Sequence, residues 1–231
     1  MIQIQLNPKL WHVRQPEVTR LMAPQYVDAF FKDGSLRLSS MAQFRSYPDE
    51  ERGDPREGER HARHTNATGS QFIFINTAPA GGNAYVLSFT ASPHLEELGK
   101  FGTDGIRVKS TFQFAAAIAA SLPDFAEGVE GPCIYTDAMV LDRNVGPLGD
   151  TFFPKDGGLR IGGHDQAQAL AQMQAGPEFY FKKRTKYFKQ CEYRMVWLVT
   201  SGVPPFIDLK CPDAVQFCER ITGAQVPTNN P

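Results

Sequence analysis

The sequence predicts a single domain of the α+β class. Candidate strands outnumber candidate helices, and the two kinds of element do not alternate regularly, as they would in a parallel α/β fold. The length of 231 residues allows one large domain or two small ones, with a sizeable core. No internal repeat is visible, and no linker clearly divides the chain. We therefore expect residues 1–231 to fold as one domain.

The N-terminal part of the chain begins with a predicted helix, which a strand follows. Large apolar residues recur at near-helical spacing over residues 16–31, and Pro24 would kink this helix or restart it at a first turn. An Asp-Gly pair is a stop signal, after which residues 35–39 alternate as a strand does. Residues 47–69 carry many charges and almost no large apolar side chain, so we expect a long charged surface loop.

The middle of the chain contains further predicted strands and one helix. Residues 71–76 have the composition of a strand, and residues 84–90, beyond a glycine-rich turn, are the expected hairpin partner. Residues 106–109 alternate as another strand. The alanine-rich residues 112–122 predict a helix that the following proline ends. Residues 133–141 are predicted as a strand because apolar and aromatic side chains dominate them.

The C-terminal part contains the strongest strand prediction of the chain. It covers residues 192–200, in which most side chains are apolar or aromatic. Residues 164–174 are predicted as a helix, and the basic and aromatic residues 179–189 are compatible with one. We expect a short helix within residues 211–222 and a frayed tail at residues 224–231.

Composition and charge exclude several classes of protein. The chain has 24 Lys and Arg against 25 Asp and Glu, which excludes a protein that is basic all round but not a local basic patch. The four cysteines form no C-x-x-C pair, so a zinc ribbon is not expected. The N-terminus lacks the pattern of a signal peptide, and no apolar stretch reaches the roughly 20 residues that span a bilayer. We expect a cytoplasmic protein that binds no membrane.

The charged loop contains the first candidate site. Residues 49–64 include six carboxylates and two histidines. Asp49, Asp54, Glu57 and His61 would be candidate ligands for a divalent metal in a nuclease. Alternatively, mixed charges simply solvate a surface loop, or the loop is a mobile lid that meets a charged ligand. Arginines alternate closely with the carboxylates and neutralise them, so we expect no metal site.

A run of cations and aromatic side chains is the second candidate site. Such a run suits phosphate contacts and base stacking on single-stranded nucleic acid, and it suits the pyrophosphate of a dinucleotide equally well. An ordinary amphipathic helix with solvated lysines has the same pattern. The candidate binding residues are Tyr180, Lys182, Lys183, Arg184, Lys186 and Tyr187.

The third candidate site is the segment Gln190-Cys191-Glu192, at the start of the strongest strand. Residues i and i+2 of a strand face the same way, so Gln190 and Glu192 would project together. The nearby cations would keep Glu192 ionised. Such a carboxylate can accept a hydrogen bond from a ribose hydroxyl and stabilise positive charge at the anomeric carbon. An ion pair with Arg194 or a lysine is the alternative role.

The order of three segments resembles a known enzyme class. In chain order, the residues concerned are Arg37 or Arg45, then Ser88, Thr90 and Ser92, and then Gln190 and Glu192. This order resembles the arginine–serine–glutamate class of ADP-ribosyltransferases, which carry an Arg on an early strand, a Ser-Thr-Ser-like strand and a Gln/Glu-x-Glu motif. The chain is also similar to a family of uncharacterised bacterial proteins through residues 36–57 and 190–194.

The resemblance implies a fold and roles for the site residues. It implies one catalytic domain, a split orthogonal β-sandwich with flanking helices, with NAD as substrate in the cleft and no metal. Glu192 would bind the nicotinamide ribose and stabilise the oxocarbenium-like transition state, and Gln190 would contact the acceptor. Arg37, preferred over Arg45 because it lies on the predicted strand, would hold the NAD phosphates. A hydroxyl of the serine motif, Ser88 or Thr90, would orient Glu192.

The resemblance also implies the acceptor and the biological role. Gln in place of Glu at the first position of the motif goes with acceptors other than arginine, so the acceptor would be an RNA or DNA base or a non-arginine protein side chain. Bacterial transferases of this kind act as toxins or phage-defence effectors and are held in check by an antitoxin or inhibitor protein. The alternatives are a metal-dependent nuclease built on residues 49–64 and a non-enzymatic nucleic-acid-binding module.

Overall fold

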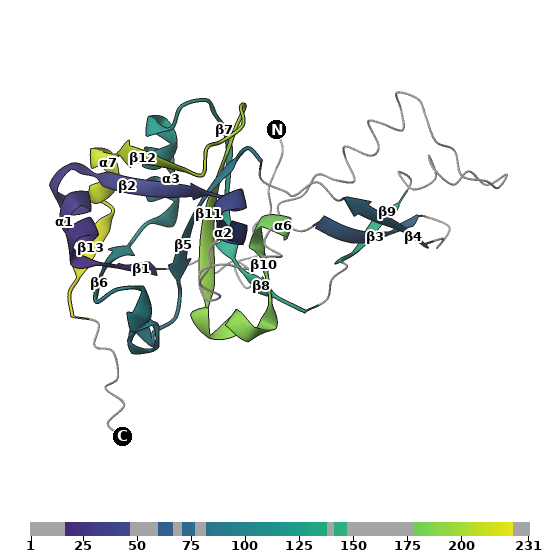
Figure 1. Cartoon of the computed structure of the whole chain (residues 1–231), viewed down its shortest axis with the longest axis horizontal. Coiled ribbons are helices and arrows are strands. Elements are labelled where there is room, and N and C mark those ends of the chain that lie inside the picture. The colour runs from purple at the N-terminus through teal and green to yellow at the C-terminus, as the bar shows by residue number, and fades with distance from the viewer. Residues whose placement is uncertain are drawn as a thin grey trace, which may run out of the picture. The chain divides into compact units, whose positions relative to one another are not determined.

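A computed structural model of the chain describes residues 17–46, 60–66, 71–76, 82–137, 141–146 and 178–223. These residues form a mixed α+β structure with one eight-stranded sheet, one three-stranded sheet and one pair of short strands (Figure 1). The predicted α+β class is therefore confirmed. None of the helices in these ranges is long and apolar enough to span a bilayer.

The chain divides into two compact units. The first unit comprises residues 1–37, 88–123 and 208–231, and the second comprises residues 38–87 and 124–207. Strands β2 (Ser35–Ser40), β5 (Ala84–Thr90) and β12 (Phe206–Lys210) contribute residues to both units. The large sheet also contains β1 (Val18–Met22), β6 (Asp104–Val108), β7 (Phe125–Pro132), β11 (Glu192–Val199) and β13 (Cys218–Ile221). Its strand order is β12-β2-β5-β1-β6-β13, and β11 pairs with β5 and with β7.

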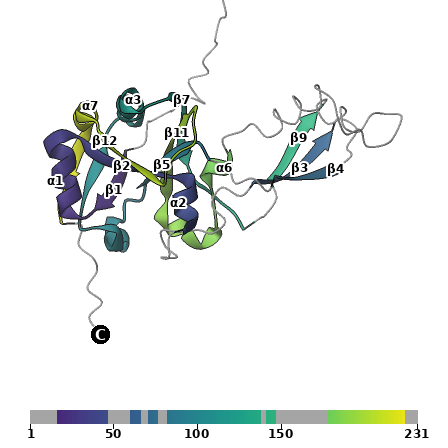
Figure 2. The same cartoon turned by 45° about the horizontal axis from the view of Figure 1, so that its top comes forward.

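The first unit contains an antiparallel group of strands with helices beside it. Strand β6 (Asp104–Val108) lies between β1 (Val18–Met22) and β13 (Cys218–Ile221) and pairs antiparallel with both. The helical elements are α1 (Pro24–Asp33), η1 (Leu95–Phe101), α3 (Thr111–Ser121) and α7 (Pro212–Val215). Helix α7 contacts both α1 and α3, as Figure 2 shows.

Aromatic side chains form part of the core of the first unit. Phe114 of α3 is fully buried. Its ring centre lies 6.3 Å from that of Phe30 on α1 and 5.8 Å from that of Phe89 on β5. These separations are typical of favourable ring pairs, so Phe114 ties two helices and a strand together.

Gly34 ends helix α1 at a place where only glycine fits. Its φ of 73° is left-handed, a conformation that other residues adopt at a cost. A Cβ at this position would also clash with the backbone of Cys211 and Pro212. The amide of Cys211 donates to the Gly34 carbonyl at 2.9 Å, so the end of α1 lies directly against the start of α7.

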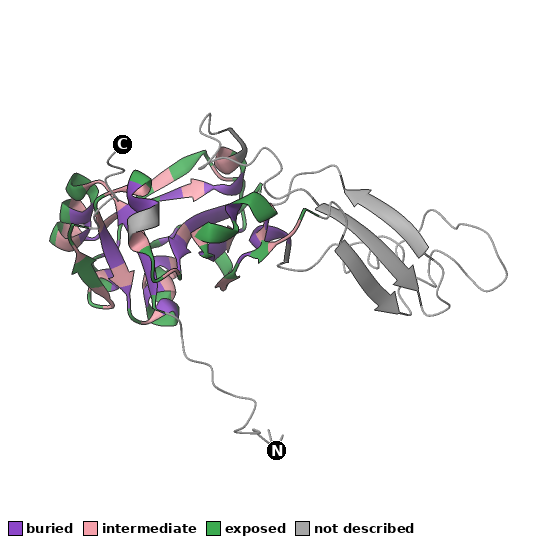
Figure 3. Ribbon diagram, turned by 90° about the horizontal axis from the view of Figure 1, so that it is seen from below, coloured by how far each residue is buried: buried purple, intermediate pink, exposed green. Residues whose placement is uncertain are grey.

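The second unit is built around β11 (Glu192–Val199), which is buried along nearly its whole length. It pairs antiparallel with β7 (Phe125–Pro132), from Tyr193 opposite Pro132 to Val199 opposite Phe125. Figure 3 shows the buried residues concentrated along the strands.

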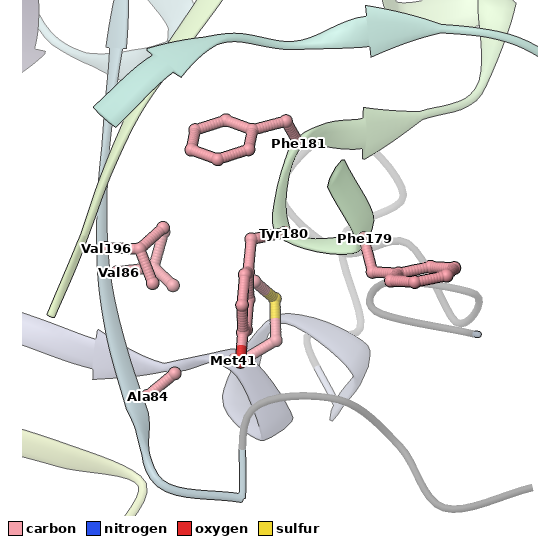
Figure 4. Close-up of a cluster of buried hydrophobic side chains, with 7 residues drawn as sticks. All are labelled: Met41, Ala84, Val86, Phe179, Tyr180, Phe181 and Val196. Atoms are coloured by element: carbon pink, nitrogen blue, oxygen red, sulfur yellow. The ribbon is translucent and has the colours of Figure 1, made fainter. Parts of the chain in front are cut away.

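A cluster of apolar residues covers one face of β11. Val196 of β11 and Val86 of β5 pack against aromatic residues of α6 (Glu178–Phe181) and against Met41 of α2 (Met41–Ser46). Figure 4 shows Tyr180 beside Met41 and the two valines next to each other. Since Glu192 and Arg194 alternate in step with Val196, they share this face of β11.

Two smaller strand groups complete the described chain. Strand β8 (Ile134–Tyr135) pairs in parallel with β10 (Lys182–Lys183), which precedes the 3-10 helix η2 (Thr185–Gln190). In the three-stranded sheet, β3 (Arg60–Asn66) lies between β4 (Gln71–Asn76), its antiparallel neighbour, and β9 (Leu141–Gly146), its parallel neighbour.

Several predicted elements are confirmed and others are wrong. The strands at 35–39, 71–76, 84–90, 106–109 and 192–200 and the helix at 112–122 are confirmed. The helix over residues 16–31 is wrong in its first half, because residues 18–22 form β1, which pairs with β6. Of the two roles predicted for Pro24, the start of a first turn is confirmed, because α1 begins at this residue.

The predicted pairing of strands is also corrected. Strand β4 pairs with β3, and β5 pairs with β1, β2 and β11, so the two strands do not form a hairpin. Strand β3 lies within residues 47–69, where we expected only a loop, and the remainder of that range lies outside the described residues.

The last predictions concern short or undescribed segments. Residues 179–189 do not form one helix but contribute to α6, β10 and η2. Of the strand predicted over residues 133–141, Ile134–Tyr135 form β8 and Leu141 begins β9, whereas residues 133, 136 and 137 are in no strand and residues 138–140 lie outside the described residues. Residues 211–222 hold the four-residue α7 and then β13. The helix at 164–174 and the tail at 224–231 lie outside the described residues.

Candidate functional site

The candidate site surrounds Glu192, the first residue of β11. Helix η2 ends at Gln190, and Cys191 then adopts a left-handed conformation with φ of 41°. This turn reverses the direction of the side chains, so that Cys191 is exposed whereas Glu192 is buried with 6% of its surface accessible. The turn therefore delivers a carboxylate to the interior at the start of the strand.

Two cations hold the carboxylate of Glu192. Arg194, two residues further along β11, donates from Nε to Glu192 Oε1 at 2.6 Å. The Lys183 Nζ atom of β10 donates to the other oxygen, Oε2. Lys183 and Arg194 are themselves 8% and 2% exposed. The ion pair considered as an alternative for Glu192 is thus present, and both partners are buried.

Further hydrogen bonds fix the two cations. Lys183 Nζ also donates to Gln190 Oε1 at 2.7 Å, and it lies 5.0 Å from the centre of the Tyr187 ring. Arg194 Nη1 donates to the carbonyl oxygen of Tyr180 at 2.6 Å. Gln190 and Glu192 bind the same ammonium group, so their side chains do meet as predicted, but Gln190 ends η2 and does not lie on the strand as the prediction assumed.

The backbone of Glu192 is held from both sides by one segment. The amide of Cys133 donates to the Glu192 carbonyl at 2.8 Å, and the Glu192 amide donates to the Tyr135 hydroxyl oxygen at 2.7 Å. Tyr135 lies opposite Lys183 in the parallel pair of β8 and β10. The segment of Cys133 and Tyr135, strand β10 and the start of β11 therefore together position the carboxylate of Glu192.

The surroundings decide the charge of these groups. Burial alone would raise the pKa of Glu192, but the charges of Arg194 and Lys183 and their hydrogen bonds outweigh it and hold the pKa well below its usual range. Burial raises the pKa of Tyr135 above its usual range, so its phenol stays neutral. The cluster thus keeps an ionised carboxylate inside the protein beside two cations.

The predicted phosphate-binding arginines lie on different elements. Arg37 of β2 is exposed and forms two hydrogen bonds with Asp208 of β12, from Nε at 2.7 Å and from Nη2 at 2.8 Å. Arg37 lowers the pKa of Asp208 through these contacts. Arg45 lies on α2, and its side chain is outside the described part of the chain.

The serine motif occupies the end of β5 and the turn after it. The Ser88 carbonyl accepts from Arg20 Nη1 at 2.6 Å. Thr90 Oγ1 accepts from the Ser92 amide at 2.9 Å, and Ser92 Oγ accepts from the amide of His94 at 3.1 Å. Together with Arg37, these residues belong to the first unit, whereas Gln190 and Glu192 belong to the second.

The basic run is mostly turned inward. Tyr180, Lys183 and Tyr187 are buried, and Tyr180 packs in the apolar cluster. Lys182 and Arg184 are half-buried, and Lys186 is exposed, with its Nζ atom 4.8 Å from the centre of the Tyr187 ring. An acceptor that binds this run in the described conformation would therefore meet Lys182, Arg184 and Lys186 rather than the rings of Tyr180 and Tyr187. The ring of Phe188, in contrast, is 56% exposed.

The structure does not describe the side chains of the metal-binding candidates in the charged loop. Asp49, Asp54 and Glu57 lie outside the described residues, and only the backbone of His61, on β3, is described. Within the described ranges, no group of three or more His, Cys, Asp or Glu side chains is placed to hold a metal ion.

Sequence reasoning missed Tyr135 and gave Arg194 only a structural role. The spacing of apolar residues indicates a strand around Tyr135, but nothing in the sequence connects that strand with β10. No protein-family model, no curated protein and no solved structure matches the chain. The chemistry of the cluster therefore has to follow from its own geometry.

Proposed function

We propose that the protein is an NAD-dependent mono-ADP-ribosyltransferase in which Glu192 is the catalytic carboxylate. The observation that carries this proposal is the ionised Glu192, which is held inside the protein by Lys183 and Arg194 beside the amide of Gln190. Such a group meets the requirement of the reaction for a fixed negative charge next to a sugar carbon that becomes positive.

The reaction breaks the bond between C1′ of the ribose and the nicotinamide nitrogen. Nicotinamide leaves with the bonding electrons, positive charge develops on the ribose, and the acceptor atom forms a new bond to C1′ and loses its proton. A carboxylate of low exposure stabilises this charge more strongly than one in water, because the surrounding medium screens it less. Arg194 keeps the carboxylate ionised and fixed in orientation.

Arg37 is the proposed ligand of the NAD phosphates. Its guanidinium group is exposed and already binds a carboxylate through two parallel hydrogen bonds. The same fork of donors matches phosphate oxygens. Lys182, Arg184 and Lys186 would contact the acceptor, an RNA or DNA base or a non-arginine side chain. An antitoxin or inhibitor protein is proposed as a further partner.

The proposal is tested by transfer of label from NAD. The purified chain is incubated with NAD labelled in the adenylate phosphate, separately with RNA, DNA and bacterial protein. We expect wild-type protein to label one of the three, and Glu192→Gln, which keeps the size of the side chain, to lose transfer while circular dichroism shows it folded. Absence of label in all three incubations would contradict the proposal, as would full activity of Glu192→Gln. Metal-dependent cleavage of RNA or DNA would support the nuclease alternative instead.

Arg37 offers a test that does not disturb the buried cluster. Arg37→Ala is expected to raise KM for NAD about tenfold or more, since a hydrogen bond to a charged group contributes about 1.5–3 kcal/mol. Arg220→Ala is the matched control, because Arg220 is also exposed and pairs with Asp28 at 2.7 Å. Equal KM values for the two variants would remove Arg37 from the proposed site.

A further inference from the structure

The ammonium group of Lys183 lies among three groups that attract cations. These are the carboxylate of Glu192, the amide oxygen of Gln190 at 2.7 Å and the ring of Tyr187, whose centre lies at 5.0 Å. A carboxylate, a carbonyl oxygen and an aromatic ring together are typical of sites that bind ammonium ions. All four residues lie in the second unit.

The backbone that carries the three groups is positioned by contacts other than those of Lys183. Tyr187 and Gln190 are three residues apart on η2, and residues at this spacing lie on the same side of a 3-10 helix. Glu192 is fixed by Arg194, and its backbone is fixed by Cys133 and Tyr135. Lys183 differs from them, because its charge sits at the end of a flexible four-carbon chain.

The oxygens that bind Lys183 favour its exchange for another cation. Glu192 Oε2 and Gln190 Oε1 both accept from Lys183 Nζ, so each would lose this partner if the lysine side chain left. A cation in its place would restore an attraction to both oxygens, and an anion would not.

We propose that Tyr187, Gln190 and Glu192 form a cation-binding site, that Lys183 occupies it in the free protein, and that a positively charged group of the substrate displaces the lysine. That the displacing group is the nicotinamide ribosyl group, which is cationic in NAD, rests on the proposed function. The existence of the site does not.

The site is tested by replacing the lysine with a free amine. Lys183→Ala removes the atoms from Cγ to Nζ, which n-propylammonium restores. We expect this ion to raise the thermal midpoint of Lys183→Ala more than sodium does at equal ionic strength, and to leave the midpoint of wild-type protein unchanged. Neutral 1-propanol should not raise it. Lys189→Ala, which removes an exposed lysine from the same helix, should not respond to the amine.

Two outcomes of this experiment would overturn the site. One is an equal shift of Lys183→Ala with propylammonium and with sodium, and the other is an equal shift in Lys189→Ala. If Lys183→Ala does not fold by itself, refolding from urea is compared with and without propylammonium. Recovery only with the amine supports the site, and no recovery in either condition overturns it.

Displacement by substrate is tested with Lys183→Met, which keeps an apolar stem and removes the charge. Nicotinamide riboside, a cation without phosphates, should bind this variant more tightly than wild type, because the lysine no longer competes. If the site is open in about one molecule in ten, the gain is about tenfold. The neutral dihydro form should gain nothing.

The two experiments separate the site from the proposed function. Weaker binding of nicotinamide riboside to Lys183→Met would make Lys183 a substrate ligand and overturn the displacement. If propylammonium stabilises Lys183→Ala but nicotinamide riboside binds neither Lys183→Met nor wild type, the cation site is supported and NAD is not its ligand. If label is transferred from NAD but propylammonium does not stabilise Lys183→Ala, the transferase activity is supported and the cation site is contradicted.

Discussion

Arg194 holds Glu192 from two residues away on the same strand, with Nε of the arginine 2.6 Å from Oε1 of the glutamate. Both side chains are buried on one face of β11. Nη1 of the arginine also donates a hydrogen bond to the carbonyl oxygen of Tyr180, so Arg194 connects the carboxylate with helix α6. The ion pair is thus also a link between a strand and the helix that covers it.

Removal of Arg194 is expected to destabilise the fold strongly. Arg194→Ala leaves Glu192 with one cation and the Tyr180 carbonyl without this donor. Loss of one partner of a buried ion pair costs about 3–5 kcal/mol. Urea unfolding followed by tryptophan fluorescence measures the free energy of unfolding. Arg220→Ala, at an exposed pair, should lose less than about 1 kcal/mol, and equal losses in the two variants would contradict the prediction.

The stability of the protein should fall in acid partly because of Glu192. Its pKa in the folded protein is below the usual value near 4.5, so the unfolded chain takes up this proton first as the pH falls. The contribution of Glu192 is therefore fully present above about pH 5 and is lost progressively below it. The difference in unfolding free energy between wild type and Glu192→Gln should narrow between pH 6 and pH 3.

Asp208 provides the control for this pH series. Its pKa is also lowered, by the hydrogen bond from Arg37, but the pair is largely exposed. Asp208→Asn should therefore follow the wild-type curve closely. If wild type and Glu192→Gln instead kept a constant difference across the pH series, Glu192 would not be the group that titrates.

The hydroxyl of Tyr135 should contribute to stability through the backbone of Glu192. Tyr135→Phe removes the oxygen that accepts from the Glu192 amide at 2.7 Å. An amide left without a partner in the interior costs about 1–3 kcal/mol. Thermal unfolding of Tyr135→Phe is compared with that of Tyr26→Phe, whose side chain is 63% exposed and whose loss should be near zero. A midpoint of Tyr135→Phe equal to that of wild type would mean that water replaces the hydroxyl.

Two phenylalanines of helix α3 should differ sharply when truncated. Phe114 is fully buried against Phe30 and Phe89, whereas Phe112 is 65% exposed. Phe114→Ala is expected to cost about 3–5 kcal/mol, because it removes ring contacts and leaves a cavity. Phe112→Ala should stay within about 0.5 kcal/mol of wild type. Chemical denaturation of both variants checks the contrast, and similar losses would show that α3 is placed differently.

The elements that were predicted correctly are those whose own residues favour the structure that they form. Strand β11 is a run of apolar and aromatic residues, and α3 is rich in alanine and begins after Ser110, so local preference and burial agree. Strand β7 was missed because its eight residues include two glycines and two glutamates and are mostly exposed. Strand pairing was predicted less well, because the partner of β4 is the charged strand β3.

The same distinction holds for the candidate site. Gln190 and Glu192 were predicted to act together from the two-residue period of a strand. Both do bind Lys183, but Gln190 ends η2, and the left-handed Cys191 separates it from the strand. Tyr135 reaches the same place through the parallel pairing of β8 and β10. That pairing joins two-residue strands distant in the chain, and no local pattern specifies it.

The interleaving of the two units has a consequence during protein synthesis. Residues 208–231 belong to the first unit, and among them β13 pairs with β6 and α7 packs against α1 and α3. A nascent chain that has not yet passed residue 207 thus carries helices and a sheet edge of the first unit without these partners. That unit can close only after residues 208–223 have left the ribosome, so we expect chaperones that protect apolar surface to stay bound to the nascent chain until then.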